Sequence, residues 1–175
     1  FTVTVTVSPM PIVPAQTASI CSNGTFSVTP VNNPPGTIIP AGTTYTWTAP
    51  TVTGGVTGGS AQATGQSSIS QTLTNPTSTT QTATYTVTPA TASCTGATFT
   101  VTVTVNPKPT VPAQTATICS GGTFSVTPVD NPPGTIIPSG TTYTWTAPTV
   151  TGGLTGGSAQ ATGQASISQT LTNPT

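Results

Sequence analysis

The sequence of 175 residues contains one cation, Lys108, and one anion, Asp130, and it has no histidine, arginine or glutamate. Charged residues make up about a quarter of an ordinary soluble chain, so this composition excludes whole classes of function. General acid–base catalysis, metal sites and phosphate recognition all need ionisable side chains that the sequence lacks. We therefore expect no enzyme, no cofactor, no metal and no nucleic-acid partner. No apolar run approaches a membrane span, so we expect no membrane insertion either.

Short stretches in which apolar and polar residues alternate follow one another along the chain, and this period of two predicts β-strands with one buried face. Asn, Gly and Pro separate these stretches, as is usual in turns. In chain order, the predicted strands cover residues 17–21, 25–30, 43–49, 68–74, 81–88 and 99–105, with shorter strand pieces in the glycine-rich stretch 50–66. About seven strands at regular spacing, without helical periodicity, predict an all-β fold, an antiparallel β-sandwich.

The inward-facing positions of these strands supply the candidate core. The most regular strand, Phe-Thr-Val-Thr-Val-Thr-Val at 99–105, has its large apolar residues on one face and its threonines on the other. Aromatic residues on an alternating strand usually pack in the core. The predicted core residues are Phe26, Tyr45, Trp47, Tyr85, Val87, Phe99, Val101 and Val103.

The chain repeats itself with an offset of 98 positions. Residues 1–77 align with residues 99–175 without a gap, and nine of the 77 aligned pairs differ. A period near 100 residues is too long for a solenoid and matches a series of independently folding domains. We therefore divide the chain into the last strand of a preceding repeat (1–8), a complete β-sandwich repeat (9–106) and a truncated following repeat (107–175). Asn106, Pro107, Lys108 and Pro109 form the predicted inter-repeat linker, which the two prolines should make short and semi-rigid.

Several motifs within the repeat resemble those of a known family. They are Thr-Tyr-Thr-Val-Thr at 84–88, Cys-Thr-Gly at 94–96, the strand at 99–105 and Asn-Pro-Lys-Pro at 106–109, with further matches at 20–22, 25–30, 43–49 and 68–73. Together they resemble the PKD-like repeats of Bacteroidota surface proteins, over the whole repeat. The resemblance implies an immunoglobulin-like sandwich, repeated in very large secreted or outer-surface adhesin-type proteins that are often exported by the type IX system. It brings no catalytic residues.

The three cysteines predict disulfides. Cys21 and Cys94 lie in one repeat, at the end of the first strand and in the loop before the last, and Cys119 would pair with position 192, outside the sequence. Closing a loop of roughly 70 residues stabilises by about 4 kcal/mol in the chain-entropy model. A metal site is the alternative, although two thiols without histidine make a poor one. A disulfide indicates an oxidising compartment, which agrees with the extracellular bacterial cell surface that the resemblance implies.

These observations favour a non-catalytic structural repeat that forms the stalk or filament of a large extracellular bacterial surface adhesin. The expected partners are neighbouring repeats of the same chain and other copies, because near-zero net charge promotes association and the strand edges lack lysines. The alternative is a carbohydrate-binding module in which Trp47 or the stretch 50–66 contacts surface glycans. Two minor interpretations are ice binding by the threonine face of 99–105 and a glycosylation sequon at Asn23, which Gly121 replaces in the second copy.

Overall fold

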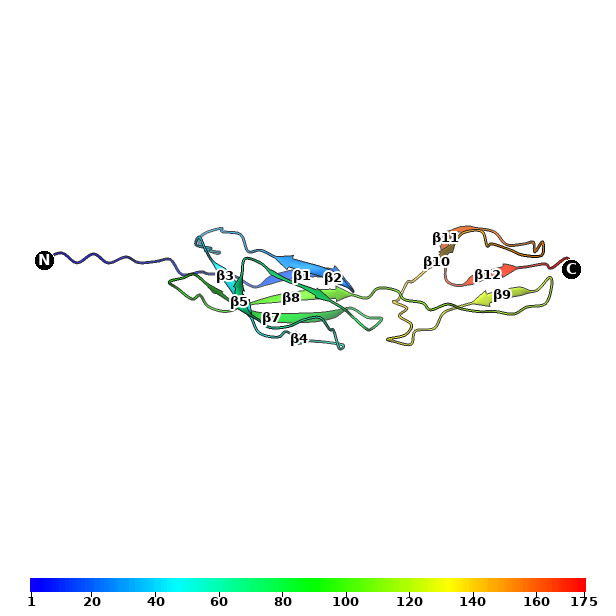
Figure 1. The fold of residues 1–175 in the computed structure, drawn as a ribbon, viewed down its shortest axis with the longest axis horizontal. Helices are drawn as coiled ribbons and strands as arrows, with labels where there is room; N and C mark the ends of the chain where they lie inside the picture. The colour runs from blue at the N-terminus through cyan, green and yellow to red at the C-terminus, as the bar shows by residue number, and fades with distance from the viewer. The chain divides into compact units, whose positions relative to one another are not determined.

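The computed structural model describes residues 1–175 and contains β-strands only (Figure 1). It has no helix of the length and apolar character needed to cross a membrane. The chain forms two compact units, unit 1 (Phe1–Pro107) and unit 2 (Lys108–Thr175). The predicted all-β fold is thus confirmed.

Unit 1 contains eight strands in two sheets. The larger sheet has the order β1-β8-β7-β3-β5, with β4 also pairing with β7, and the smaller sheet pairs β2 with β6. The strands are β1 (Gln16–Cys21), β2 (Gly24–Val28), β3 (Thr44–Trp47), β4 (Thr51–Val52), β5 (Gln62–Gln66), β6 (Ile69–Leu73), β7 (Gln81–Ala90) and β8 (Phe99–Asn106). The short strand pieces predicted in the glycine-rich stretch 50–66 are β4 and β5.

Strand β8 lies between β7 and β1 in the larger sheet. It pairs antiparallel with β7 and parallel with β1, from Gln16 opposite Val101 to Cys21 opposite Asn106. Every other strand pair in the structure is antiparallel. This parallel pair is the one exception in a sandwich that is otherwise antiparallel, as predicted, and it places the last residues of β1 and β8 at the same end of unit 1.

The core forms where the inner faces of the two sheets meet. Along β8 the burial alternates as the sequence predicts, and Val101, Val103 and Val105 are fully buried. The rings of Phe26 and Tyr85 have centroids 5.4 Å apart and bring the two sheets together. Such aromatic contacts contribute beyond the area that they bury.

Residues 1–7, predicted as the last strand of a preceding repeat, have no strand partner in the structure. They form an extended segment with exposed side chains, and Figure 1 shows it projecting from unit 1.

Unit 2 repeats part of this architecture. Its strands are β9 (Thr123–Val126), β10 (Tyr143–Trp145), β11 (Gln160–Gln164) and β12 (Ile167–Thr170), which match β2, β3, β5 and β6 in sequence. β9 pairs with β12 and β10 with β11. Residues 114–119, which match β1, form no strand, because unit 2 has no counterpart of the β8 strand with which β1 pairs.

Candidate functional site

The ionisable side chains do not form a chemical site. Lys108 and Asp130 are exposed, and no group of three His, Cys, Asp or Glu residues could hold a metal ion. Asp130 instead has a structural role, because its Oδ1 atom accepts a hydrogen bond from the backbone N–H of Ile137 at 2.7 Å. Asn32 makes the equivalent bond to Ile39 at 2.8 Å, so the charge is not required.

The predicted core residues are all buried: Phe26, Tyr45, Trp47, Tyr85, Val87, Phe99, Val101 and Val103. Trp47 is 6% exposed, and its indole N–H donates a hydrogen bond to the carbonyl of Ser60 at 3.1 Å. The Tyr85 hydroxyl donates to Oε1 of Gln71 at 2.9 Å. Burial raises the pKa of Tyr85 to about 12 and also raises that of Tyr45. These aromatic rings fill the sandwich, so they are not a platform for sugar rings.

A buried polar cluster closes the end of unit 1 where β8 finishes. The Asn75 side chain donates hydrogen bonds to the carbonyls of Thr79 and Val105 at 2.7 and 2.9 Å. Its Oδ1 atom accepts from the N–H and the hydroxyl of Thr77, while the Ser22 hydroxyl bonds the Asn75 backbone. Sequence reasoning assigned Asn75 to an ordinary turn and missed this role. The recurrence of the same residue as Asn173 was the only signal for it.

The same end of unit 1 holds Cys21, and the opposite end holds Cys94. Cys21 lies opposite Asn106, the last residue of β8, whereas Cys94 lies in the loop before Phe99, its first residue. Seven steps of about 3.3 Å separate the two ends of β8 by about 23 Å, and a disulfide needs Cα atoms within about 7 Å.

The predicted Cys21–Cys94 disulfide is therefore corrected: Cys21, Cys94 and Cys119 are free thiols in the structure. An antiparallel first strand would have brought Cys21 back toward the loop before β8. The parallel pairing of β1 with β8 takes it to the other end.

The Cys94 thiol lies close to the segment through which the chain enters unit 1. It donates a hydrogen bond to the carbonyl of Ser8 at 3.7 Å. Pro11 follows, fully buried, and its carbonyl lies so close to Gly96 that a side chain at that glycine would collide with it. The chain thus joins unit 1 beside the start of β8 and leaves it after Asn106, at the other end.

One residue of the predicted linker belongs to the sheet, and its last two residues are exposed to solvent. Asn106 is the last residue of β8, and its side-chain amide donates to the hydroxyl of Ser19 at 3.2 Å and accepts from that of Thr80. Pro107 is half-buried, while Lys108 and Pro109 are exposed. The boundary between the two units falls between Pro107 and Lys108. Asn106 therefore belongs to the sandwich, and the free part of the joint is shorter than predicted.

Part of the chain matches a known protein family. Residues 18–109 match the sequence profile of the family described as the PKD-like domain. This range runs from within β1 through β8 to Pro109. No curated protein sequence matches the chain.

Proposed function

Because the chain belongs to the PKD-like domain family, we propose that it is a non-catalytic structural module in the stalk or filament of a large extracellular bacterial adhesin. The motif resemblance to Bacteroidota surface repeats supports this source, and the near absence of charged side chains argues against catalysis by the module itself.

One observation carries the proposal: the chain joins unit 1 at one end of β8 and leaves it at the other. The carbonyl of Ser8 lies at the Cys94 end, and Asn106 lies at the Cys21 end. A module whose connections lie at opposite ends adds its own length to a chain of such modules. The repeat with an offset of 98 residues supports a series of these modules. A β8 strand of eight residues, or seven steps of about 3.3 Å, gives each module a strand length of about 23 Å.

The structure offers no comparable support for the carbohydrate-binding alternative. Trp47 is buried and its indole N–H already has a protein acceptor. Titration with glycans should accordingly leave the tryptophan fluorescence of the chain unchanged.

Immuno-electron microscopy of the native cells tests the proposal. Antibodies raised against residues 9–106 should label thin fibres outside the cell, at regular intervals along each fibre. Label confined to the cytoplasm, or to compact particles without fibres, would refute it. The matched control is pre-absorption of the antibody with the purified chain, which should abolish the label.

A further inference from the structure

The two cysteines of unit 1 lie at its two ends, beside the points where the chain enters and leaves. Cys21 lies opposite Asn106, after which the chain leaves the unit. The Cys94 thiol donates a hydrogen bond to the carbonyl of Ser8, where the chain enters. The length of β8 keeps the two thiols apart within the module, so any bond that they form must reach outside it.

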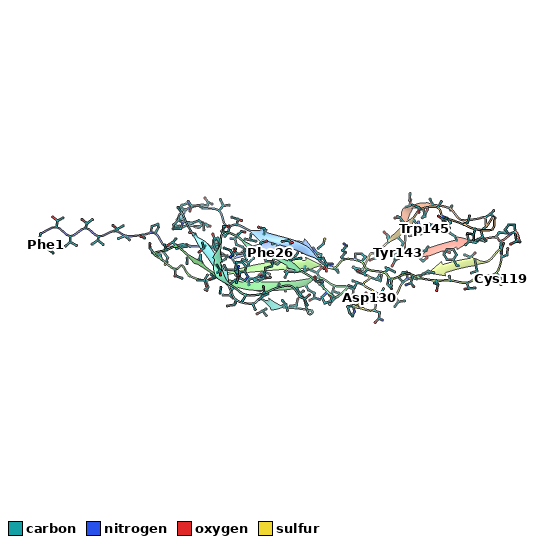
Figure 2. The ribbon with its side chains drawn as sticks, in the orientation of Figure 1. Phe1, Phe26, Cys119, Asp130, Tyr143 and Trp145 are labelled. Atoms are coloured by element: carbon teal, nitrogen blue, oxygen red, sulfur yellow. The ribbon has the colours of Figure 1, made fainter.

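Unit 2 places its first cysteine in the same way. Cys119 is the equivalent of Cys21, 98 positions later. The loop that contains Asp130 holds the entering chain, because Ile136 and Thr110 exchange backbone hydrogen bonds of 2.8 and 2.9 Å. Figure 2 shows Asp130 and Cys119 at opposite ends of this unit. The first cysteine of a module therefore lies at the end away from the entering chain.

Ser8 and Asn106 hold equivalent places in the repeat. They are 98 positions apart, and each directly follows the same sequence, Phe-Thr-Val-Thr-Val-Thr-Val. In a series of modules, the residue at this place has both sets of contacts. Those of Asn106 are with the module that the chain leaves, and those of Ser8 are with the module that it enters.

The backbone carbonyl at this place contacts both modules. The Asn106 carbonyl accepts the backbone N–H of Ser22 at 2.8 Å, so the Cα atom of the preceding residue, Cys21, lies within about 6 Å of that oxygen. The Ser8 carbonyl accepts the Cys94 thiol at 3.7 Å. A carbonyl oxygen has two lone pairs and can accept both bonds. Cys21 of one module and Cys94 of the next therefore approach one oxygen atom.

We propose that Cys94 of each module forms a disulfide with Cys21 of the module before it. A disulfide joins Cα atoms about 4.4–6.8 Å apart, and two cysteines beside the same oxygen satisfy this by rotation of their side chains. The Cys21 side chain is exposed and Cys94 is half-buried, so both are accessible to a partner. This bond joins two modules, unlike the bond within one module that the length of β8 excludes. The inference rests on the proposed filament function, because it requires modules in series.

A low-molecular-weight disulfide such as oxidised glutathione supplies the oxidising equivalents. The thiolate of one cysteine attacks the small disulfide, forms a mixed disulfide and releases one small thiol. The thiolate of the other cysteine attacks the protein sulfur of the mixed disulfide, forms the protein disulfide and releases the second small thiol. The two cysteines lose two protons and two electrons, and the small disulfide gains both.

Such bonds shorten the covalent path along a filament. From Cys94, 25 residues lead to Cys119, the first cysteine of the next module. A path through the disulfides and these residues alone passes two modules within about 80–90 Å when fully extended, whereas two whole repeats extend to about 650–700 Å. Load on a cross-linked filament follows the short path, so the strands that it bypasses are protected from unfolding by force.

The experiment uses the 175-residue chain with a second copy of residues 78–106 added after Thr175, which completes the second module. The addition places a second copy of Cys94 at position 192, so this chain has four cysteines. After incubation with oxidised and reduced glutathione, free thiols are alkylated and protein disulfides are counted by mass spectrometry. We expect one protein disulfide, between Cys21 and position 192. Two protein disulfides, as bonds within both modules would give, or none, would overturn the inference.

Single substitutions identify the cysteines that react. Cys21→Ser should lose the disulfide, while the matched Cys94→Ser and Cys119→Ser should keep it. Cys21 and Cys119 are both exposed, and circular dichroism should confirm that all three variants fold. A disulfide that persists in Cys21→Ser, or that is lost in either control, would also overturn the inference. Microscopy tests the filament separately, because fibres without this bond would refute the cross-link alone.

Discussion

Replacing Asn75 by Asp isolates the contribution of the buried polar cluster, because the two side chains have nearly the same shape. Asn75 is 1% exposed. Its amide nitrogen donates to the carbonyls of Thr79 and Val105, and its oxygen accepts two bonds from Thr77. In Asn75→Asp the carboxylate keeps the bonds from Thr77 and turns an oxygen toward the two carbonyls that have lost their donor.

The expected cost is about 3–5 kcal/mol at neutral pH. Each lost hydrogen bond removes about 1 kcal/mol, and the carbonyls left without a donor add to this. A buried charge without a partner costs about 3–5 kcal/mol, and unit 1 contains no cationic side chain to offset it. Because a whole domain is stable by about 5–15 kcal/mol, this one change removes a large share of the stability of unit 1.

The destabilisation by Asn75→Asp should increase with pH, because the introduced carboxyl is buried. Burial favours the neutral acid, so the pKa of the introduced carboxyl lies above the unfolded value of about 3.9. Below that unfolded value both states are protonated and the difference from the native chain is small. The loss begins as the pH rises above the unfolded pKa, because the unfolded chain releases its proton first, and it is complete above the folded pKa.

The free energy of unfolding of unit 1 is measured in urea, with amide hydrogen exchange in β7 and β8 as the probe, because those strands belong to unit 1 alone. The matched control is Asn173→Asp, the same change at the equivalent residue of unit 2. Asn173 is exposed, and its side chain accepts bonds only from Thr175, so the expected change is below about 0.5 kcal/mol. Equal effects at the two sites, or a loss in Asn75→Asp that is the same at pH 3 and pH 7, would refute the reasoning.

Three other predictions use the repeat as an internal control or the burial of a tyrosine. Leu73→Ala should cost about 2–5 kcal/mol in urea unfolding, and Leu171→Ala, at a half-buried site, clearly less; equal costs would contradict the packing argument. Gly58→Ala should destabilise the chain more than Gly42→Ala. Gly58 has a φ of 91° and a backbone carbonyl of the opposing strand lies against the new methyl group, whereas Gly42 has a φ of 78° and lies in open space. The reverse order in thermal melts would contradict this prediction. The stability of unit 1 should fall as the pH rises from about 10 toward 12, because burial raises the pKa of Tyr85 and the unfolded chain releases its proton first. Tyr85→Phe should lessen that fall in alkaline urea titrations, and an unchanged profile would exclude Tyr85 as its cause.

The sequence was sufficient to predict the strands and their buried faces. The alternation in 99–105 predicted which side chains of β8 point inward, since a strand exposes successive residues to opposite faces. It was not sufficient for strand direction, because alternation is the same in parallel and antiparallel pairs. The direction of β1 decides at which end of unit 1 Cys21 lies, so the sequence could not show that Cys21 and Cys94 are far apart.

Other structural features could not be predicted, because the sequence carries a weak signal for them or none. The strand predicted at 43–49 is β3, but the sequence did not show that β3 and β4 both pair with β7, with a break before Thr51. Pro50 lies in this break and has no N–H to donate to the sheet. The buried role of Asn75 depends on carbonyls 4 and 30 residues away, which no local pattern reveals.

The composition of the chain limits how such modules can associate with one another. Lysines often protect a strand edge, and complementary charges often give an interface its specificity. This chain has one cation and one anion, so neither means is available to it. Any non-covalent association between modules of the proposed filament must then depend on strand register and on the fit of apolar side chains.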